Sequence, residues 1–91
     1  MAQLTFTKNN NQWVAEFEVT ADFNIHIERA TGGTLGLYQR TTASGEYAPI
    51  QGAVLQLGKT FDADFIGAIY PKYIKVVSSA EVTNAELTLK A

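Results

Sequence analysis

The stretch Trp13-Val14-Ala15-Glu16-Phe17-Glu18-Val19-Thr20 alternates in a way that decides the fold class. Successive side chains of a β-strand point to opposite faces, so a strand here separates two sets of residues. One set is Trp13, Ala15, Phe17 and Val19, and the other is Val14, Glu16, Glu18 and Thr20. The first set is apolar and large enough to line a core. The stretch therefore predicts a strand with one buried face.

The same alternation recurs on both sides of this stretch. We expect further extended segments at 3–7, 23–28, 35–40, 47–50, 53–57, 61–65 and 73–79, separated by turn-forming residues. Residues 82–89 also fit a helix, but a helix would bury Glu86, so a strand is favoured. The β-branched segment 73–79 is expected in the centre of a sheet. The aromatic residues expected in the core are Phe6, Trp13, Phe17, Phe61 and Phe65.

These segments predict an all-β fold with a single domain over residues 1–91. We expect one antiparallel β-sandwich, jelly-roll-like or Ig-like, of about 7–9 short strands. The first two long strands are expected to pair as a hairpin with a three-residue loop at 21–23. A five-residue loop would also keep the apolar faces together. The expected pairs are Val19 with Ile25, Phe17 with Ile27 and Glu18 with His26.

Composition excludes several function classes. The net charge is −2 and cysteine is absent, so disulfides and thiol chemistry are excluded and a nucleic-acid partner is not expected. The first residues show no basic region followed by an apolar run, so no signal peptide is expected. No apolar run reaches the roughly 18 residues of a membrane span, so no membrane partner is expected.

The residues offer little for catalysis. His26 is the one histidine, and no Gly-x-Ser-x-Gly motif surrounds a serine. Asp62 and Asp64 lie about 7 Å apart on one strand face, a separation that could serve glycoside hydrolysis. An outward charged face of an edge strand explains them better. We expect no enzyme activity, no catalytic residue and no cofactor.

A metal site has one candidate cluster. In the expected hairpin register, Glu16, Glu18, His26 and Glu28 share one sheet face, with two glutamates directly opposed. Carboxylates on strands are common and this spacing is not specific to metal ligands. A solvated face, with His26 paired to Glu18, is therefore the preferred interpretation, and no metal is expected.

Tyrosines near cationic residues are the candidate contact sites. Tyr and Arg are the residues that protein interfaces favour, and a tyrosine ring can also stack on a sugar. An equal alternative is that these tyrosines cover the ends of the fold, with their hydroxyl groups exposed to water. The candidate residues are Tyr38, Arg40, Tyr47, Tyr70, Lys72 and Tyr73.

The layout of these segments is similar to that of small β-sandwich structural proteins of tailed bacteriophages, namely head-decoration, head-fibre or tail-associated modules. Three stretches carry the resemblance, followed by a closing strand at 85–89. They are Trp13-Val14-Ala15-Glu16-Phe17, Leu37-Tyr38-Gln39-Arg40 with its Ser-Gly loop and Tyr47-Ala48-Pro49-Ile50, and Tyr73-Ile74-Lys75-Val76-Val77-Ser78-Ser79. The resemblance is architectural and carries over no residue's role.

The resemblance implies a non-enzymatic structural or assembly protein of a phage virion, made in the host cytoplasm. Its expected partners are itself, as a homotrimer or homodimer, and a capsid or tail protein. Exposed strand edges and apolar patches of a small domain also favour self-association. The alternative is a cytoplasmic carbohydrate-binding or adhesion module that uses the exposed tyrosines, with a glycan as partner.

Overall fold

The computed structural model describes residues 2–66 and 70–90, with the side chains of Ala2 and of residues 51–57 outside that description. Across these residues the chain forms strands and no helix, so there is no helix here that could cross a bilayer. The strands are β1 (Ala2–Gln3), β2 (Thr7–Asn9), β3 (Gln12–Val19), β4 (Phe23–Arg29), β5 (Gly33–Arg40), β6 (Ala48–Leu57), β7 (Thr60–Phe65), β8 (Lys72–Ser78) and β9 (Val82–Leu89). The all-β prediction is confirmed.

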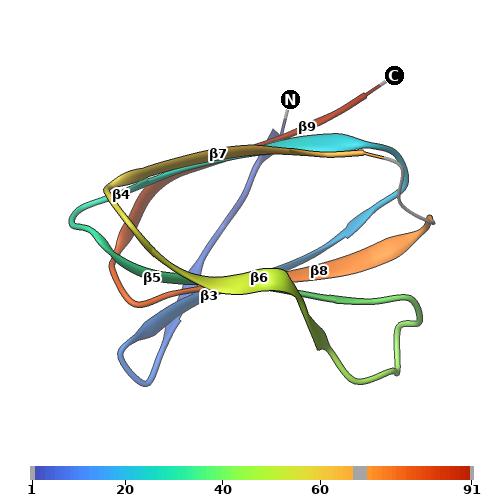
Figure 1. Ribbon diagram of the computed structural model, residues 1–91, viewed down its shortest axis with the longest axis horizontal. Coiled ribbons are helices and arrows are strands. Elements are labelled where there is room, and N and C mark those ends of the chain that lie inside the picture. Colours follow the sequence, from blue (N-terminus) through green and yellow to red (C-terminus); the bar gives the residue numbers. More distant parts are fainter. Residues whose placement is uncertain (1, 67–69, 91) are drawn as a thin grey trace.

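Two antiparallel sheets lie as two layers (Figure 1). One sheet has four strands in the order β1-β9-β4-β7, and the other has five in the order β2-β3-β8-β5-β6. Both sheets contribute to one buried cluster, because the apolar face of each turns toward the other. Its members are Val19, Phe23, Ile25, Ile27, Leu35, Leu37, Ile74, Val76, Ala85 and Leu87.

The strand pairs are nested along the chain. β5 pairs with β6, β4 with β7, β3 with β8 and β1 with β9, so each pair encloses the one before it. The pairs β4·β9 and β5·β8 then join these four into the two sheets. The four nested pairs are therefore those of one long hairpin, and the hairpin is folded so that its strands lie in two layers.

The predicted hairpin between the first two long strands is wrong. β3 pairs with β2 and β8, whereas β4 pairs with β7 and β9, and the two strands lie in different sheets. Residues 20–22 carry the chain from one layer to the other. Val19 and Ile25 both face the core, but they do so from opposite sides. The alternation correctly predicted which side chains of these strands face the core. It does not show which of the two sheets a strand belongs to.

Other predicted segments agree more closely with the structure. Residues 82–89 form a strand, and β8 lies between β3 and β5 inside its sheet, as expected. β6 runs from Ala48 to Leu57 through the predicted break at Gln51-Gly52. Its pairing with β5 is nevertheless irregular at that point, because Gly36 pairs with Val54 and Tyr38 with Pro49, so the register shifts across residues 50–53. The Tyr70–Pro71 peptide bond, whose isomer the sequence left open, is cis.

The expected aromatic core is present in large part. Phe6, Phe17, Phe61 and Phe65 are partly buried and pack against the central cluster. Phe65 stacks on Phe23 across the β4·β7 pair, with ring centroids 4.9 Å apart. Trp13 is half-buried, and the ammonium of Lys8 lies 5.4 Å from the centroid of its ring. These contacts close the sides of the space between the layers.

A buried arginine ties three turns together at one end of the sheets. Arg29 is 3% exposed, and burial lowers the pKa of its guanidinium. It donates hydrogen bonds to the carbonyl oxygens of Gly58 at 2.7 Å, Thr34 at 3.0 Å and Gly33 at 3.3 Å. A longer bond of 3.4 Å reaches Oγ of Ser78. The guanidinium thus gives these carbonyl groups a hydrogen-bond donor inside the fold, which the Thr34 oxygen accepts in addition to the Ser79 amide.

Candidate functional site

The outer face of the five-stranded sheet gathers four of the six candidate residues. Register places Tyr38 beside Lys75 and Arg40 beside Tyr73, on the adjacent strands β5 and β8. Tyr47 joins them from the segment before β6, since its ring lies near both cations. We call Tyr38, Arg40, Tyr47, Tyr73 and Lys75 the tyrosine face.

Cation–π contacts hold the tyrosine face together. The guanidinium of Arg40 lies 4.3 Å from the ring centroid of Tyr47 and 5.7 Å from that of Tyr73. The ammonium of Lys75 lies 5.6 Å from the Tyr47 centroid. Arg40 also donates a hydrogen bond of 2.9 Å to the carbonyl oxygen of Gly45. Each exposed contact of this kind stabilises by about 0.5–1 kcal/mol, so the side chains are positioned before any partner arrives.

Tyr47 remains protonated in this environment. Burial and a hydrogen bond with Glu16 raise the pKa of its hydroxyl, and the nearby charge of Arg40 only partly opposes this. Glu16 reaches the site because β3 pairs with β8, where Glu16 stands opposite Lys75. A neutral tyrosine hydroxyl has one hydrogen to donate, and here it goes to Glu16, so the hydroxyl offers its oxygen to a partner as an acceptor.

A shallow depression of about 330 Å³ opens within the face, lined by Gln12, Tyr38, Tyr47, Lys75 and Val77. Tyr38 borders it because its ring folds over Gly36. A Cβ atom on Gly36 would lie 3.1 Å from the Tyr38 ring, so the glycine makes room for that ring. An aromatic ring over a strand glycine also covers backbone that would otherwise be bare.

The other two candidates lie apart from the depression. Lys72 lines a second hollow of about 290 Å³ together with Arg40, beside the loop at 41–46. Tyr70 packs against the core and donates a hydrogen bond of 2.7 Å to Oδ1 of Asp22. The sequence analysis did not predict Lys75, and it placed Glu16 in the candidate metal cluster and not beside the tyrosines. Only the pairing of β3 with β8 and of β8 with β5 brings these two residues to the tyrosines.

The outer face of the four-stranded sheet carries the one histidine. His26 contacts Oδ2 of Asp62 through Nδ1 and Oε2 of Glu28 through Nε2, both at 2.8 Å. Hydrogen bonds to Glu28 and then Asp62 raise the pKa of His26. The pairing of His26 with Glu18 predicted above is wrong, because Glu18 lies on the outer face of the other sheet.

The candidate metal cluster, for which a solvated face was the preferred interpretation, is also divided between the two layers. Glu16 and Glu18 belong to β3 and point away from one sheet, while His26 and Glu28 belong to β4 and point away from the other. The described residues contain no group of three or more His, Asp or Glu side chains arranged to hold a metal ion.

Asp62 and Asp64 are linked through an amide. Nδ2 of Asn24 donates to Oδ1 of Asp62 at 2.7 Å and to Oδ1 of Asp64 at 2.9 Å. The bond from Asn24, and then the one from His26, lowers the pKa of Asp62. A glycosidase acid needs a raised pKa, so the shift at Asp62 has the wrong sign for that role.

Comparison of the chain with protein-family models, with curated proteins and with solved structures finds no match to any of the three.

Proposed function

We propose that this chain is a non-enzymatic structural or assembly protein that acts through contacts with copies of itself and with another protein. The tyrosine face carries the proposal. Three tyrosines and two cations lie together on one sheet, held in place by their own contacts. Tyrosine and arginine are enriched among the residues that supply most of the binding energy at protein interfaces, and fixed side chains lose little entropy on binding.

We further infer that the two layers form a jelly-roll β-sandwich. The nested pairs β5·β6, β4·β7, β3·β8 and β1·β9 support it, together with the cross-pairs that split them between two sheets. Winding a long hairpin in this way generates the Greek-key connections of a jelly roll. An Ig-like order agrees less well, because Ig sheets of the constant type run in the order A-B-E-D and C-F-G.

On this basis we propose a component of a phage particle, a capsid-decoration, fibre or tail-associated module that forms a homotrimer or homodimer in the virion. Jelly rolls are the fold of many viral capsid domains, which supports this assignment along with the resemblance of the strand layout. The reading frames beside its gene test it. Capsid, portal or tail frames there would support the proposal, and a neighbourhood without virion genes would overturn it.

Sedimentation velocity tests the self-association. We expect wild-type protein at about 100 μM to sediment as more than one copy, and Tyr47→Ser/Tyr73→Ser to weaken association at least about tenfold. Tyr70→Phe is the matched control, since it alters a tyrosine outside the face. A wild-type monomer at this concentration would overturn the proposal, as would a double variant that is folded by circular dichroism and associates like wild type.

A carbohydrate-binding module is the second candidate. The depression bordered by Tyr38, Tyr47 and the amide of Gln12 favours it, because sugars bind to aromatic rings flanked by hydrogen-bonding groups. Arg40 and Lys75 already lie over the Tyr47 ring, which counts against stacking there. Glycan-array binding that disappears in Tyr38→Ala would support this function, and an array without any signal would overturn it.

A further inference from the structure

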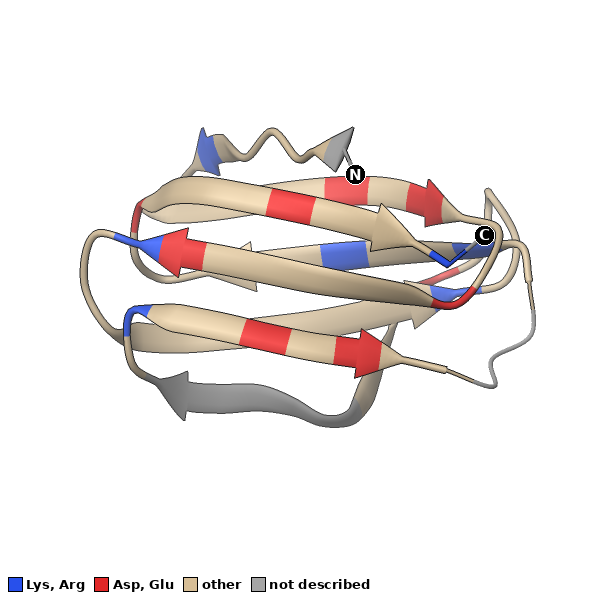
Figure 2. Cartoon of the chain, turned by 90° about the horizontal axis from the view of Figure 1, so that it is seen from above, with Lys and Arg blue, Asp and Glu red and all other residues tan. Residues whose placement is uncertain are grey.

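His26 lies on the outer face of the four-stranded sheet, with a carboxylate against each nitrogen of its ring. Nδ1 is 2.8 Å from Oδ2 of Asp62 on β7, and Nε2 is 2.8 Å from Oε2 of Glu28 on its own strand. Glu86 stands opposite His26 on β9. Figure 2 looks onto this sheet and shows acidic residues along β4, β7 and β9, with basic residues at the strand ends. The charged groups that surround the ring are therefore carboxylates.

The contacts on both sides of the ring require it to be charged. A carboxylate oxygen only accepts hydrogen bonds, so a ring nitrogen 2.8 Å from one must donate. Neutral imidazole has one N–H group, and its other nitrogen would turn a lone pair toward a carboxylate. Imidazolium has two N–H groups and satisfies both acceptors. This is the arrangement of protonated His26, and a ring that loses its proton must give up one of the two contacts.

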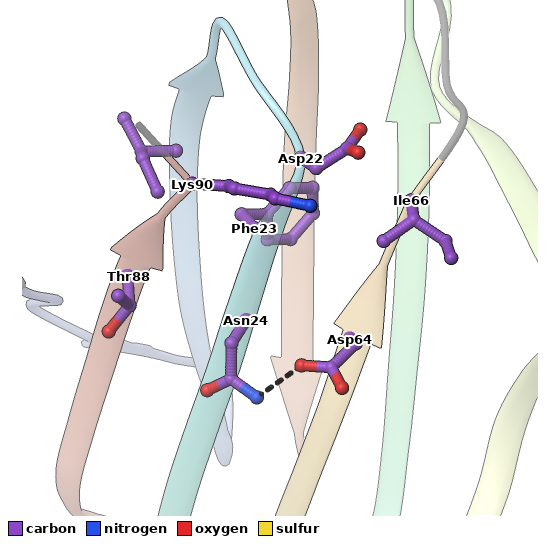
Figure 3. Close-up of a pocket in the computed structure, with 8 residues that line it drawn as sticks. Asp22, Phe23, Asn24, Asp64, Ile66, Thr88 and Lys90 are labelled. Carbon is purple, nitrogen blue, oxygen red and sulfur yellow. Dashed lines mark hydrogen bonds between the residues drawn. The ribbon is translucent and has the colours of Figure 1, made fainter.

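The two carboxylates differ in their other hydrogen bonds. Asp62 also accepts a bond of 2.7 Å from Nδ2 of Asn24. Figure 3 shows the same amide turned toward Asp64, which it bonds at 2.9 Å. Within the described part of the chain, the carboxylate of Glu28 has His26 as its one hydrogen-bond partner. A neutral ring therefore loses less by leaving Asp62, which keeps the amide of Asn24, than by leaving Glu28.

The contact with Asp62 joins two strands, whereas the contact with Glu28 stays within one. β7 is an edge strand, since β4 is its one neighbour among the strands that the structure describes. At one end of β7, Phe65 is held by its ring stack on β4. Toward the other end, at Thr60, the bond from His26 is the last side-chain hydrogen bond that the described residues make between the two strands.

We propose that His26 is a proton-operated latch that fastens the edge strand β7 to β4. With the ring charged, Nδ1 donates to Asp62 across the two strands and Nε2 donates to Glu28. With the ring neutral, the remaining proton stays on Nε2, the contact with Glu28 persists and Asp62 is released. The latch involves no partner molecule, so it is independent of the proposed function.

The direction of the response to pH follows from the two contacts. Hydrogen bonds to Glu28 and then to Asp62 favour the charged ring and raise the pKa of His26. A group whose pKa is higher in the folded protein stabilises it fully below the ordinary value, here 6.5. The latch is therefore closed below pH 6.5 and opens as pH rises through the higher folded pKa.

Two NMR measurements on wild-type protein test the latch. The nitrogen-15 shifts of the imidazole show which nitrogens carry protons, and we expect both below the transition and Nε2 alone above it. Amide exchange shows how firmly β7 is paired with β4. We expect protection factors at residues 60–62 to fall by about two- to fivefold above the transition, the effect of one exposed ion pair. A neutral ring protonated at Nδ1, or protection that is equal on both sides of the transition, would overturn the latch.

Two variants distinguish the latch from a general effect of charge. Asp64→Asn is the matched control, because Asp64 also points outward from β7 but bonds Asn24 and not His26. The pH dependence of protection should remain in this variant. Glu28→Gln places an amide that can donate to Nε2, so a neutral ring should keep its proton on Nδ1 and its bond to Asp62. Protection should then change little with pH. The latch is overturned if protection in Glu28→Gln still falls as in wild type, or if Asp64→Asn abolishes the fall.

Discussion

Replacing Arg29 by methionine removes the guanidinium while filling similar space. The two shorter hydrogen bonds, 2.7 Å to Gly58 and 3.0 Å to Thr34, come from a charged donor, for which about 1.5–3 kcal/mol each is typical, or about 3–6 kcal/mol together. Part of this loss of free energy is offset in the variant. The Thr34 oxygen keeps a bond of 3.1 Å from the Ser79 amide, Gly58 is exposed, and a buried charge no longer needs desolvation.

We therefore expect Arg29→Met to lower the free energy of unfolding by about 2–4 kcal/mol. At about 4–8 °C per kcal/mol for a domain of this size, Tm should fall by roughly 8–32 °C. Urea denaturation followed by Trp13 fluorescence measures the change. Lys59→Met is the control, because Lys59 is exposed and its replacement should cost less than about 1 kcal/mol. A loss below about 0.5 kcal/mol in Arg29→Met would refute the idea that this side chain ties the turns.

Three further predictions concern single sites. The raised pKa of His26 means that its contribution to stability is complete below its ordinary value of 6.5 and is lost as pH rises through the higher folded value. NMR titration of the single imidazole should show the raised pKa, and Asp62→Asn should lower it. Gly33→Ala should destabilise by about 1–3 kcal/mol in urea melts, because φ is +158° and the new Cβ would lie 2.5 Å from Oγ of Ser79; an unchanged midpoint would contradict this. Ile25 is 0% exposed, so Ile25→Ala should lower the free energy of unfolding by about 2–5 kcal/mol. A smaller decrease would mean that the core closes around the gap.

Alternation carried most of the fold prediction. The period of two in β3, β4 and β7 identified the strands and the faces that turn inward, because side-chain direction is a local property of extended backbone. Strand pairing is not local. β3 and β4 are adjacent in sequence and both face the core, yet β3 pairs with β2 and β8, and β4 pairs with β7 and β9. Nothing in the alternation distinguishes a hairpin from a crossing between layers.

The candidate site shows the same limit. Tyr38 and Arg40 stand two residues apart on β5, so the alternation of a strand puts both side chains on one face. Lys75 lies in the site because β5 pairs with β8. His26 contacts Asp62 and not the predicted Glu18, because β4 pairs with β7. Tyr70 shows the opposite case, since it is near Tyr73 in sequence but its hydroxyl bonds Asp22.

The nested pairs also decide when each strand meets its partner during synthesis. Among the nested pairs, β5 and β6 are the first to be complete, whereas β4 must wait for β7, β3 for β8 and β1 for β9. A ribosome adds about 5–20 residues each second, so the early strands spend seconds without their partners. Their alternate polar residues keep one side of each strand wetted in that interval. Neither sheet can be completed before the last two strands are made, because β8 joins β3 to β5 and β9 joins β1 to β4.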